Sequence, residues 1–166
     1  MIAYKFLRAD GSSVFTAFRW PLPSSEPGPW VDAHVDPCHS GIHASRPADL
    51  PHWAGRVLYT IELDGEIIAA PTKVVASRAR LLRRIDAWEL GLRDAYTRGC
   101  ADRAHELAQG LPDWDTTIER LVPYGPALLG FMAARIAQER GGADAYRAER
   151  ERQATWLAER LGLDPD

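Results

Sequence analysis

The fold class is decided by Arg56-Val57-Leu58-Tyr59-Thr60-Ile61-Glu62-Leu63, the clearest β-strand pattern in the chain. β-Branched and aromatic residues are frequent in this stretch, and the turn-forming pair Asp64-Gly65 is expected to end the strand. Residues 66–70 and 72–76 form another extended stretch around Pro71, and that proline indicates a sheet edge or a bulge. The middle of the chain is therefore predicted to form strands.

The N-terminal part of the sequence extends this β-rich pattern. Residues 2–8 are dense in strand formers, Asp10-Gly11 supplies turn chemistry, and residues 13–20 resume the pattern. These features predict a hairpin-like pair. Residues 21–29 contain four prolines and are expected to form a surface loop. A short helix is predicted at residues 46–54.

The hydrophobic period changes from Ser77 onward. Apolar residues then recur at intervals of three and four: Leu81, Ile85, Trp88, Leu92 and Tyr96. This spacing predicts an amphipathic helix with Ser77 as its N-cap, followed by further helices. The predicted fold is α+β: a small twisted, mostly antiparallel sheet in a β-rich domain at residues 1–77, and a helical region at residues 78–166 packed on it.

Composition narrows the classes of function. The chain has 166 residues, a hydrophobic fraction of 46% and a formal net charge of −3, which argues against nucleic acid as a partner. No apolar run approaches the roughly 20 residues that span a membrane. Two cysteines make no disulfide framework. We therefore expect a cytoplasmic chain whose partner is another protein or a small molecule.

The segment from His34 to Arg46 is denser in reactive side chains than a fold requires. Imidazole and thiolate groups are ligands that zinc prefers, and a tetrahedral site needs about four of them. The four candidate metal ligands are His34, Cys38, His39 and His43. Their spacing matches no known zinc module, so the alternative of a polar turn around Gly41 stays open.

The order Cys38-x-x-Gly41-Ile42-His43, followed by a strand and by Lys73, resembles a family of small phage and bacterial proteins of unknown function. The matching residues are Lys5, Cys38, Gly41, His43, Tyr59, Gly65 and Lys73. The resemblance covers roughly residues 1–88 and implies a fold without implying an activity. On this interpretation the chain is an accessory binding or interaction protein that uses the His34–Arg46 segment as its contact surface. The ligand-binding residues there and nearby are Cys38, His39, Arg46 and Lys73.

A second resemblance points to chemistry. Leu7-Arg8-Ala9-Asp10 is similar to the opening strand of bacterial ADP-ribosyltransferases of the Arg-Ser-Glu class. In that family the arginine holds a phosphate of NAD, for which a planar cationic fork is suited. The resemblance implies that Arg8 binds phosphate, and that Ser45 or His43 holds the nicotinamide ribose as a catalytic residue.

The same family needs a carboxylate, usually from a Glu-x-Glu on a late strand. The matching triplet in this chain, Glu149-Arg150-Glu151, lies in a charged segment predicted to be helical and is interpreted as a solvated face. Whether the chain is an enzyme therefore stays open, with NAD as the first cofactor to test and zinc as the second.

Four arginines follow Lys73 and form a basic cluster: Arg78, Arg80, Arg83 and Arg84. On the predicted helix these side chains form a solvated or locally paired face, with a bound anion as the alternative.

Overall fold

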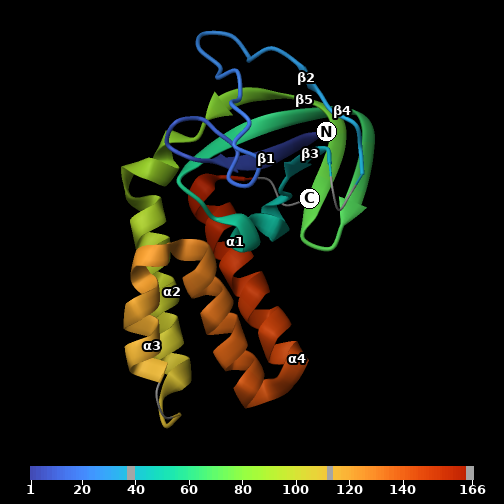
Figure 1. Cartoon of the computed structure of the whole chain (residues 1–166). Coiled ribbons are helices and arrows are strands. Elements are labelled where there is room, and N and C mark those ends of the chain that lie inside the picture. Colours follow the sequence, from blue (N-terminus) through green and yellow to red (C-terminus); the bar gives the residue numbers. More distant parts are fainter. Residues whose placement is uncertain (37–39, 112–113, 164–166) are drawn as a thin grey trace.

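The computed structural model describes residues 1–36, 40–111 and 114–163 and has the predicted α+β architecture, shown in Figure 1. An antiparallel sheet occupies the N-terminal half, and helices make up the C-terminal half. The short helix α1 (Leu50–Trp53) lies between the two units. Within the described residues, no helix has the length and apolar character needed to cross a membrane.

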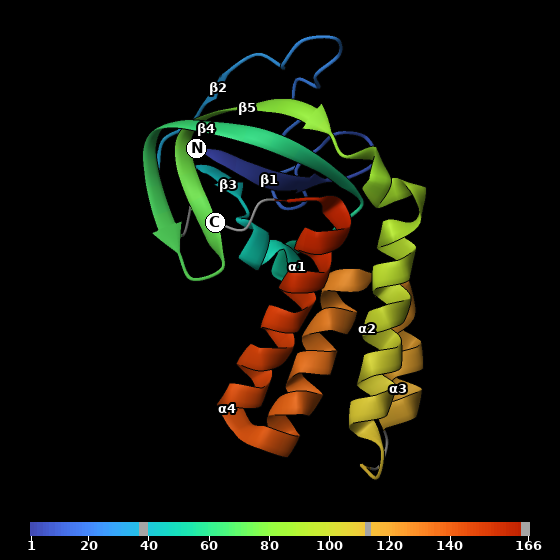
Figure 2. The same ribbon diagram turned by 180° about the vertical axis from the view of Figure 1, so that it is seen from behind.

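The described part of the chain forms five strands: β1 (Ile2–Leu7), β2 (Val31–Asp32), β3 (Ile42–Ala44), β4 (Val57–Ala70) and β5 (Lys73–Arg84). They are hydrogen-bonded in the order β1-β4-β5-β2, and β3 also pairs with β5. Directly after β3, Ser45 exchanges main-chain hydrogen bonds of 2.7 and 2.9 Å with Tyr4 of β1. The path β1-β4-β5-β3 therefore returns to β1 and forms a small ring of strands, seen from behind in Figure 2.

The interior of this ring is apolar. Its buried residues include Ala3, Leu7, Ile42, Val57, Ile61, Leu63, Val74, Ala79 and Leu81. Trp20, which follows β1 in a loop, joins them and is 6% exposed. Side chains alternate between the two faces of a strand. Tyr4 and Phe6 of β1 therefore point away from the ring interior and pack with the helical core.

Two expected boundaries of the strands are wrong. Asp64-Gly65 does not end β4, because the backbone makes a bulge there and the strand continues to Ala70. Gly65 has a φ of +71°, and a Cβ at this position would lie 2.3 Å from the Ser77 hydroxyl oxygen. Glycine is therefore required at the bulge. Ser77 does not cap a helix but lies within β5, where its hydroxyl accepts a hydrogen bond from the Glu66 amide.

β5 continues to Arg84, beyond the predicted end of the extended stretch at residue 76, because its side chains alternate between two environments. Ala79 and Leu81 are buried in the ring, while Arg78 and Arg80 point outward and pair with Asp64 and Glu62. This alternation has the period of a strand, and β4 supplies the hydrogen-bonding partner along its length. The basic cluster consequently lies on the outside of a sheet.

The second strand predicted near the N-terminus is also wrong. Residues 13–20 contain no strand and are closed by short-range hydrogen bonds, from the Ser13 amide to the Phe18 carbonyl and from the Ala17 amide to the Ser13 carbonyl. The short helix expected at residues 46–54 is confirmed, as a 3-10 turn (Pro47–Asp49) that leads into α1.

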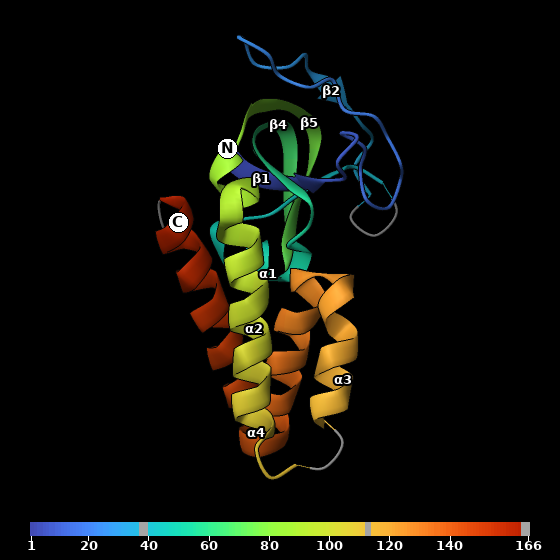
Figure 3. The ribbon, with the colours of Figure 1, turned by 90° about the vertical axis from the view of Figure 1, so that its left-hand side faces the viewer.

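The helical unit begins after β5. Its elements are a wide turn η2 (Trp88–Leu92), α2 (Arg93–Ala108), α3 (Trp114–Leu121), η3 (Val122–Tyr124) and α4 (Pro126–Leu161). α4 bends at Gly142, which has a φ of +74°, so that its two arms fold back on each other. Figure 3 shows α2 packed beside these arms and α3 outside them.

Trp88 joins the two units. Its side chain is fully buried, its ring lies 5.4 Å from the Phe6 ring of β1, and 6.2 Å from the Tyr96 ring of α2. The indole N–H donates to the carbonyl of Gly55 over 3.1 Å. One apolar core thus continues from the outer face of the ring into the helices.

A polar network is buried inside the helical unit, which corrects the interpretation of Glu149 and Arg150 as part of a solvated face, whereas Glu151 is exposed as expected. Glu149 is only 4% exposed and accepts hydrogen bonds from Arg103, Arg152 and Gln153. Gln153 also donates to the carbonyl of Gly130, on the other arm of α4. Glu149 therefore ties both arms and α2 together, and its carboxylate is occupied by structural partners.

The network extends to His52 of α1. Arg150 donates to its Nδ1 over 2.7 Å. A guanidinium only donates, so Nδ1 accepts and the imidazole is neutral. Burial, and then the charge of Arg150, lower the His52 pKa to about 4.

This arrangement predicts a pH-dependent stability. The imidazole of the unfolded chain titrates near 6.5, so between pH 6.5 and 4 the unfolded state binds more protons than the folded state. The free energy of unfolding therefore decreases as the pH falls through that window. Urea unfolding at a series of pH values should show a weaker loss for His52→Asn than for the wild type. Replacement of the exposed His34 by Asn is the control and should keep the wild-type slope. Equal slopes for wild type and His52→Asn would contradict the assignment.

Candidate functional site

The predicted zinc ligands are described only in part. Cys38 and His39 lie outside the described residues. His34 is exposed, and His43 is half-buried on β3. Among the residues that the structure describes, no group of three His, Cys, Asp or Glu side chains is arranged to hold a metal ion.

His43 lies between two positive charges. Its Nε2 is buried and has no hydrogen-bond partner in the described part of the chain. Burial, followed by the charges of Lys73 and Lys5, lowers the His43 pKa. The ring is therefore neutral at physiological pH, and the surrounding charges disfavour a further cation.

The other predicted site residues have structural partners. Arg46 forms an ion pair with Asp49 at 2.6 Å and donates to the carbonyl of Ala70, which fixes the end of the β4–β5 hairpin. Lys73 lies over the Trp53 ring, 6.0 Å from its centre.

Two further predicted residues, Arg8 and Ser45, are also engaged by the fold. Arg8 is exposed and donates to the carbonyl of Val14 over 2.5 Å. Ser45 is buried in the bridge to Tyr4. The described part of the structure has two cavities, one where the ring meets the helices and one beside β1, and neither is lined by Arg8, His43 or Ser45.

A larger cavity lies where the ring meets the helices. We call this cavity the arginine cleft, because Arg56, Arg93 and Arg98 line it, and its volume is about 540 Å³. Residues 54–56, between α1 and β4, line one side of it, the first two turns of α2 line another, and residues 122–126 complete it. Both α2 and α4 begin at the cleft, so the positive ends of two helix dipoles lie beside it.

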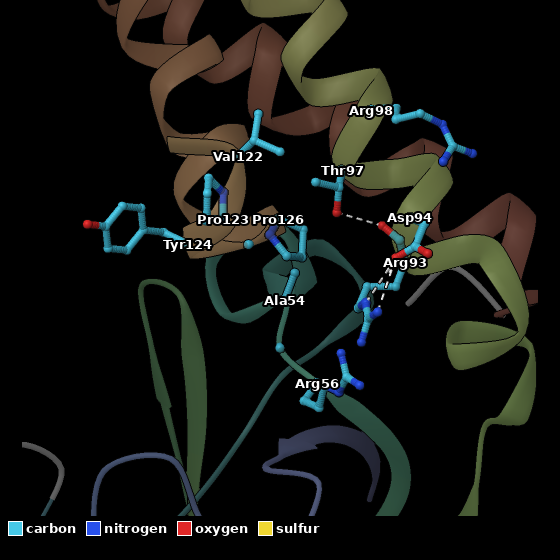
Figure 4. A pocket seen from close by; sticks show the side chains of 12 residues that line it. Ala54, Arg56, Arg93, Asp94, Thr97, Arg98, Val122, Pro123, Tyr124 and Pro126 are labelled. Atoms are coloured by element: carbon cyan, nitrogen blue, oxygen red, sulfur yellow. Dashed lines mark hydrogen bonds and ion pairs between the residues drawn. The ribbon is translucent and has the colours of Figure 1, made fainter. Parts of the chain in front are cut away.

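Three guanidinium groups surround this cleft: Arg56, Arg93 and Arg98. Figure 4 shows Arg56 and Arg93 pointing toward each other, with Arg98 farther along α2. Asp94 pairs with Arg93 at 3.1 Å and is the only carboxylate in the lining. Arg56 and Arg98 have no ion-pair partner within the described ranges. The cleft therefore has an excess of two positive charges.

The side of the cleft opposite the arginines is apolar. Val122 is 41% exposed and Tyr124 is 75% exposed. Pro123 and Pro126 interrupt the helical hydrogen bonding between α3 and α4. Pro126 is the first residue of α4, a position at which the backbone N–H has no partner within the helix. Figure 4 places Tyr124, Pro123 and Val122 across the cleft from Arg93 and Arg98. The site thus combines cationic donors with an apolar and aromatic wall.

These residues were missed from the sequence, since each fits an ordinary structural role. Arg56 begins a strand, and Arg93 and Arg98 are polar positions of a helix. A cation in the first turn of a helix opposes its dipole, but the sequence predicts a helix from Ser77 onward, so neither Arg93 nor Arg98 lies near a predicted helix start. The approach of Arg56 depends on the packing of the two units.

Comparison of the chain with models of protein families, with curated proteins and with solved structures gives no match. The resemblances to a phage and bacterial family and to ADP-ribosyltransferases therefore stay predictions.

Proposed function

We propose that this protein is a binding protein for a small phosphate-bearing molecule, which is held in the arginine cleft. The observation that carries this proposal is that Arg56, Arg93 and Arg98 all line one cavity whose lining contains a single carboxylate. Guanidinium groups bind phosphate through paired, charge-assisted hydrogen bonds, and two of the three are not neutralised by the protein. A phosphate group supplies the missing negative charge.

The size and the wall of the cleft extend the ligand beyond a free phosphate ion. Its volume of about 540 Å³ lies within the range typical of small-molecule sites. The exposed face of Tyr124 offers a stacking surface for a planar ring, and Val122 offers an apolar contact. A nucleotide combines a phosphate with a planar base, so nucleotides, NAD among them, are the ligand class that we propose.

A binding role is favoured over catalysis by the state of the residues expected to act on NAD. Arg8 donates to a backbone carbonyl, Ser45 is part of a buried strand bridge, and Glu149 is held by three donors. The predicted contact segment from His34 to Arg46 stays a separate proposal for a protein partner.

The test is a binding titration of the full chain by calorimetry with ADP, NAD⁺ and inorganic phosphate. Loss of a hydrogen bond to a charged group costs about 1.5–3 kcal/mol, so Arg56→Ala and Arg98→Ala should each weaken ADP binding by about 10- to 100-fold. The control is Arg83→Ala, which removes the same charge from an exposed position on β5.

Two results would overturn the proposal. One is the absence of binding by any of the three probes. The other is an equal loss of affinity in Arg83→Ala, since that would show attraction by overall charge instead of recognition in the cleft.

A further inference from the structure

A second cavity opens into the ring of strands and is separate from the arginine cleft. It has a volume of about 130 Å³ and lies between β1, the loop at residues 13–20, β2 and the start of β3. Lys5 lines it from β1, on the same strand face as the buried Ala3 and Leu7. Its side chain is therefore directed toward the interior of the ring, and it is half-buried.

The ammonium group of Lys5 has no anionic partner in the described chain. It donates to the carbonyl of His43 over 2.6 Å, and its Nζ lies 5.1 Å from the centre of the Trp20 ring. A carbonyl and a ring face stabilise a cation less than a carboxylate does, and charges taken out of water are normally paired. Burial lowers the Lys5 pKa to about 8, as expected for a cation that lacks a counter-ion.

Two hydroxyl groups of the cavity have a proton to donate. The Ser13 oxygen accepts a hydrogen bond from the Trp20 indole N–H at 2.9 Å, and the Thr16 oxygen accepts one from the Phe18 amide at 3.4 Å. A hydroxyl that accepts from the protein keeps its own O–H for another acceptor.

The carboxylate that lines this cavity does not offset these donors. The side chain of Asp32 is 79% exposed and pairs with Arg78 at 3.6 Å. The polar groups that face the cavity are thus mainly donors, around one positive charge.

We propose that this cavity is a binding site for a short-chain carboxylate, with the ligand oxygens on the Lys5 ammonium and the Ser13 hydroxyl. The hydrocarbon part contacts Trp20, Phe18 and Ile42. The cavity has the volume of about four water molecules in the liquid, which admits an acid of a few carbon atoms and excludes a nucleotide. This site does not depend on the function proposed for the arginine cleft.

The composition of the chain provides a matched control, since Lys5 and Lys73 are its only lysines. Calorimetric titration of the full chain with butyrate should show saturable binding, and butyramide, which has the same shape without the charge, should bind at least about tenfold more weakly. Lys5→Met should weaken butyrate binding by about tenfold or more, whereas Lys73→Met should leave it unchanged. Arg56→Ala, in the other cleft, should also leave it unchanged.

Folding of the variants is checked by thermal unfolding. Lys5→Met replaces an unpaired cation by an apolar side chain of similar length, so its Tm should equal or exceed that of the wild type. Ala33→Leu is a second variant that fills the cavity without removing the charge, and it should also abolish butyrate binding. The proposal is overturned if the wild type does not bind butyrate, if butyramide binds equally well, or if Lys5→Met and Lys73→Met bind butyrate alike.

Discussion

Replacement of Glu149 by alanine is expected to lower the free energy of unfolding by about 1.5–3 kcal/mol, because it removes a buried carboxylate that accepts charge-assisted hydrogen bonds and leaves the buried Gln153 amide without one of its acceptors. The Glu149 carboxylate accepts from Arg103 at 3.2 Å and from Arg152 at 2.6 Å, with Gln153 as a third donor. Burial alone would raise the pKa of Glu149, but these hydrogen bonds hold it below its ordinary value. Urea unfolding followed by circular dichroism measures the loss.

The sequence provides a close control two residues away. Glu151 is exposed on the same helix, and its replacement by alanine should change stability by no more than about 0.5 kcal/mol. Glu149→Gln keeps an acceptor and loses the charge, so it should fall between the two. Equal effects of Glu149→Ala and Glu151→Ala would show that the network contributes nothing.

Replacement of Trp88 by alanine should cost about 3–5 kcal/mol, since it removes a large, fully buried side chain. The change also removes the packing of the Phe6 ring and the hydrogen bond to the Gly55 carbonyl. Because Trp88 connects the ring of strands with the helices, both units should lose stability together. Thermal unfolding monitored at a β-sheet band and at a helix band in the infrared tests this.

Leu90, two residues along the chain and 85% exposed, is the matched position. Leu90→Ala should leave both transitions within about 1 °C of the wild type, because an exposed side chain loses little contact. A Trp88→Ala protein in which only the helical band shifts would contradict the idea of a shared core.

Local features of the fold were predictable and long-range ones were not. The strand at residues 56–63 follows from residue types that restrict the backbone, and it is present in β4. Pro71, expected at a sheet edge or a bulge, lies instead in the turn between β4 and β5. The segment after Ser77 satisfies two patterns at once, with a strand alternation in residues 78–81 and a helical spacing from Leu81 onward. Pairing with β4 decides between them, and pairing is not visible in a single segment.

The sites show the same limit. The resemblance to a phage and bacterial family drew attention to Lys5, but not to its environment, which forms only when Trp20 folds back over β1. Arg56 and Arg93 meet because the start of β4 lies against the start of α2. The segment from His34 to Arg46 attracted attention by its composition, whereas both described cavities draw most of their lining from other parts of the chain.

The closed ring of strands sets an order of events during protein synthesis. The amino group of Met1 donates to the carbonyl of Leu63, 62 residues later, and β1 pairs with β4 over its whole length. At translation rates of about 5–20 residues per second, β1 leaves the ribosome several seconds before its partner. The β4–β5 hairpin, whose strands are adjacent in sequence, forms in about 1–10 μs once both are available. β1 is therefore synthesised well before the strand with which it pairs, and it stays without that partner until β4 has left the ribosome.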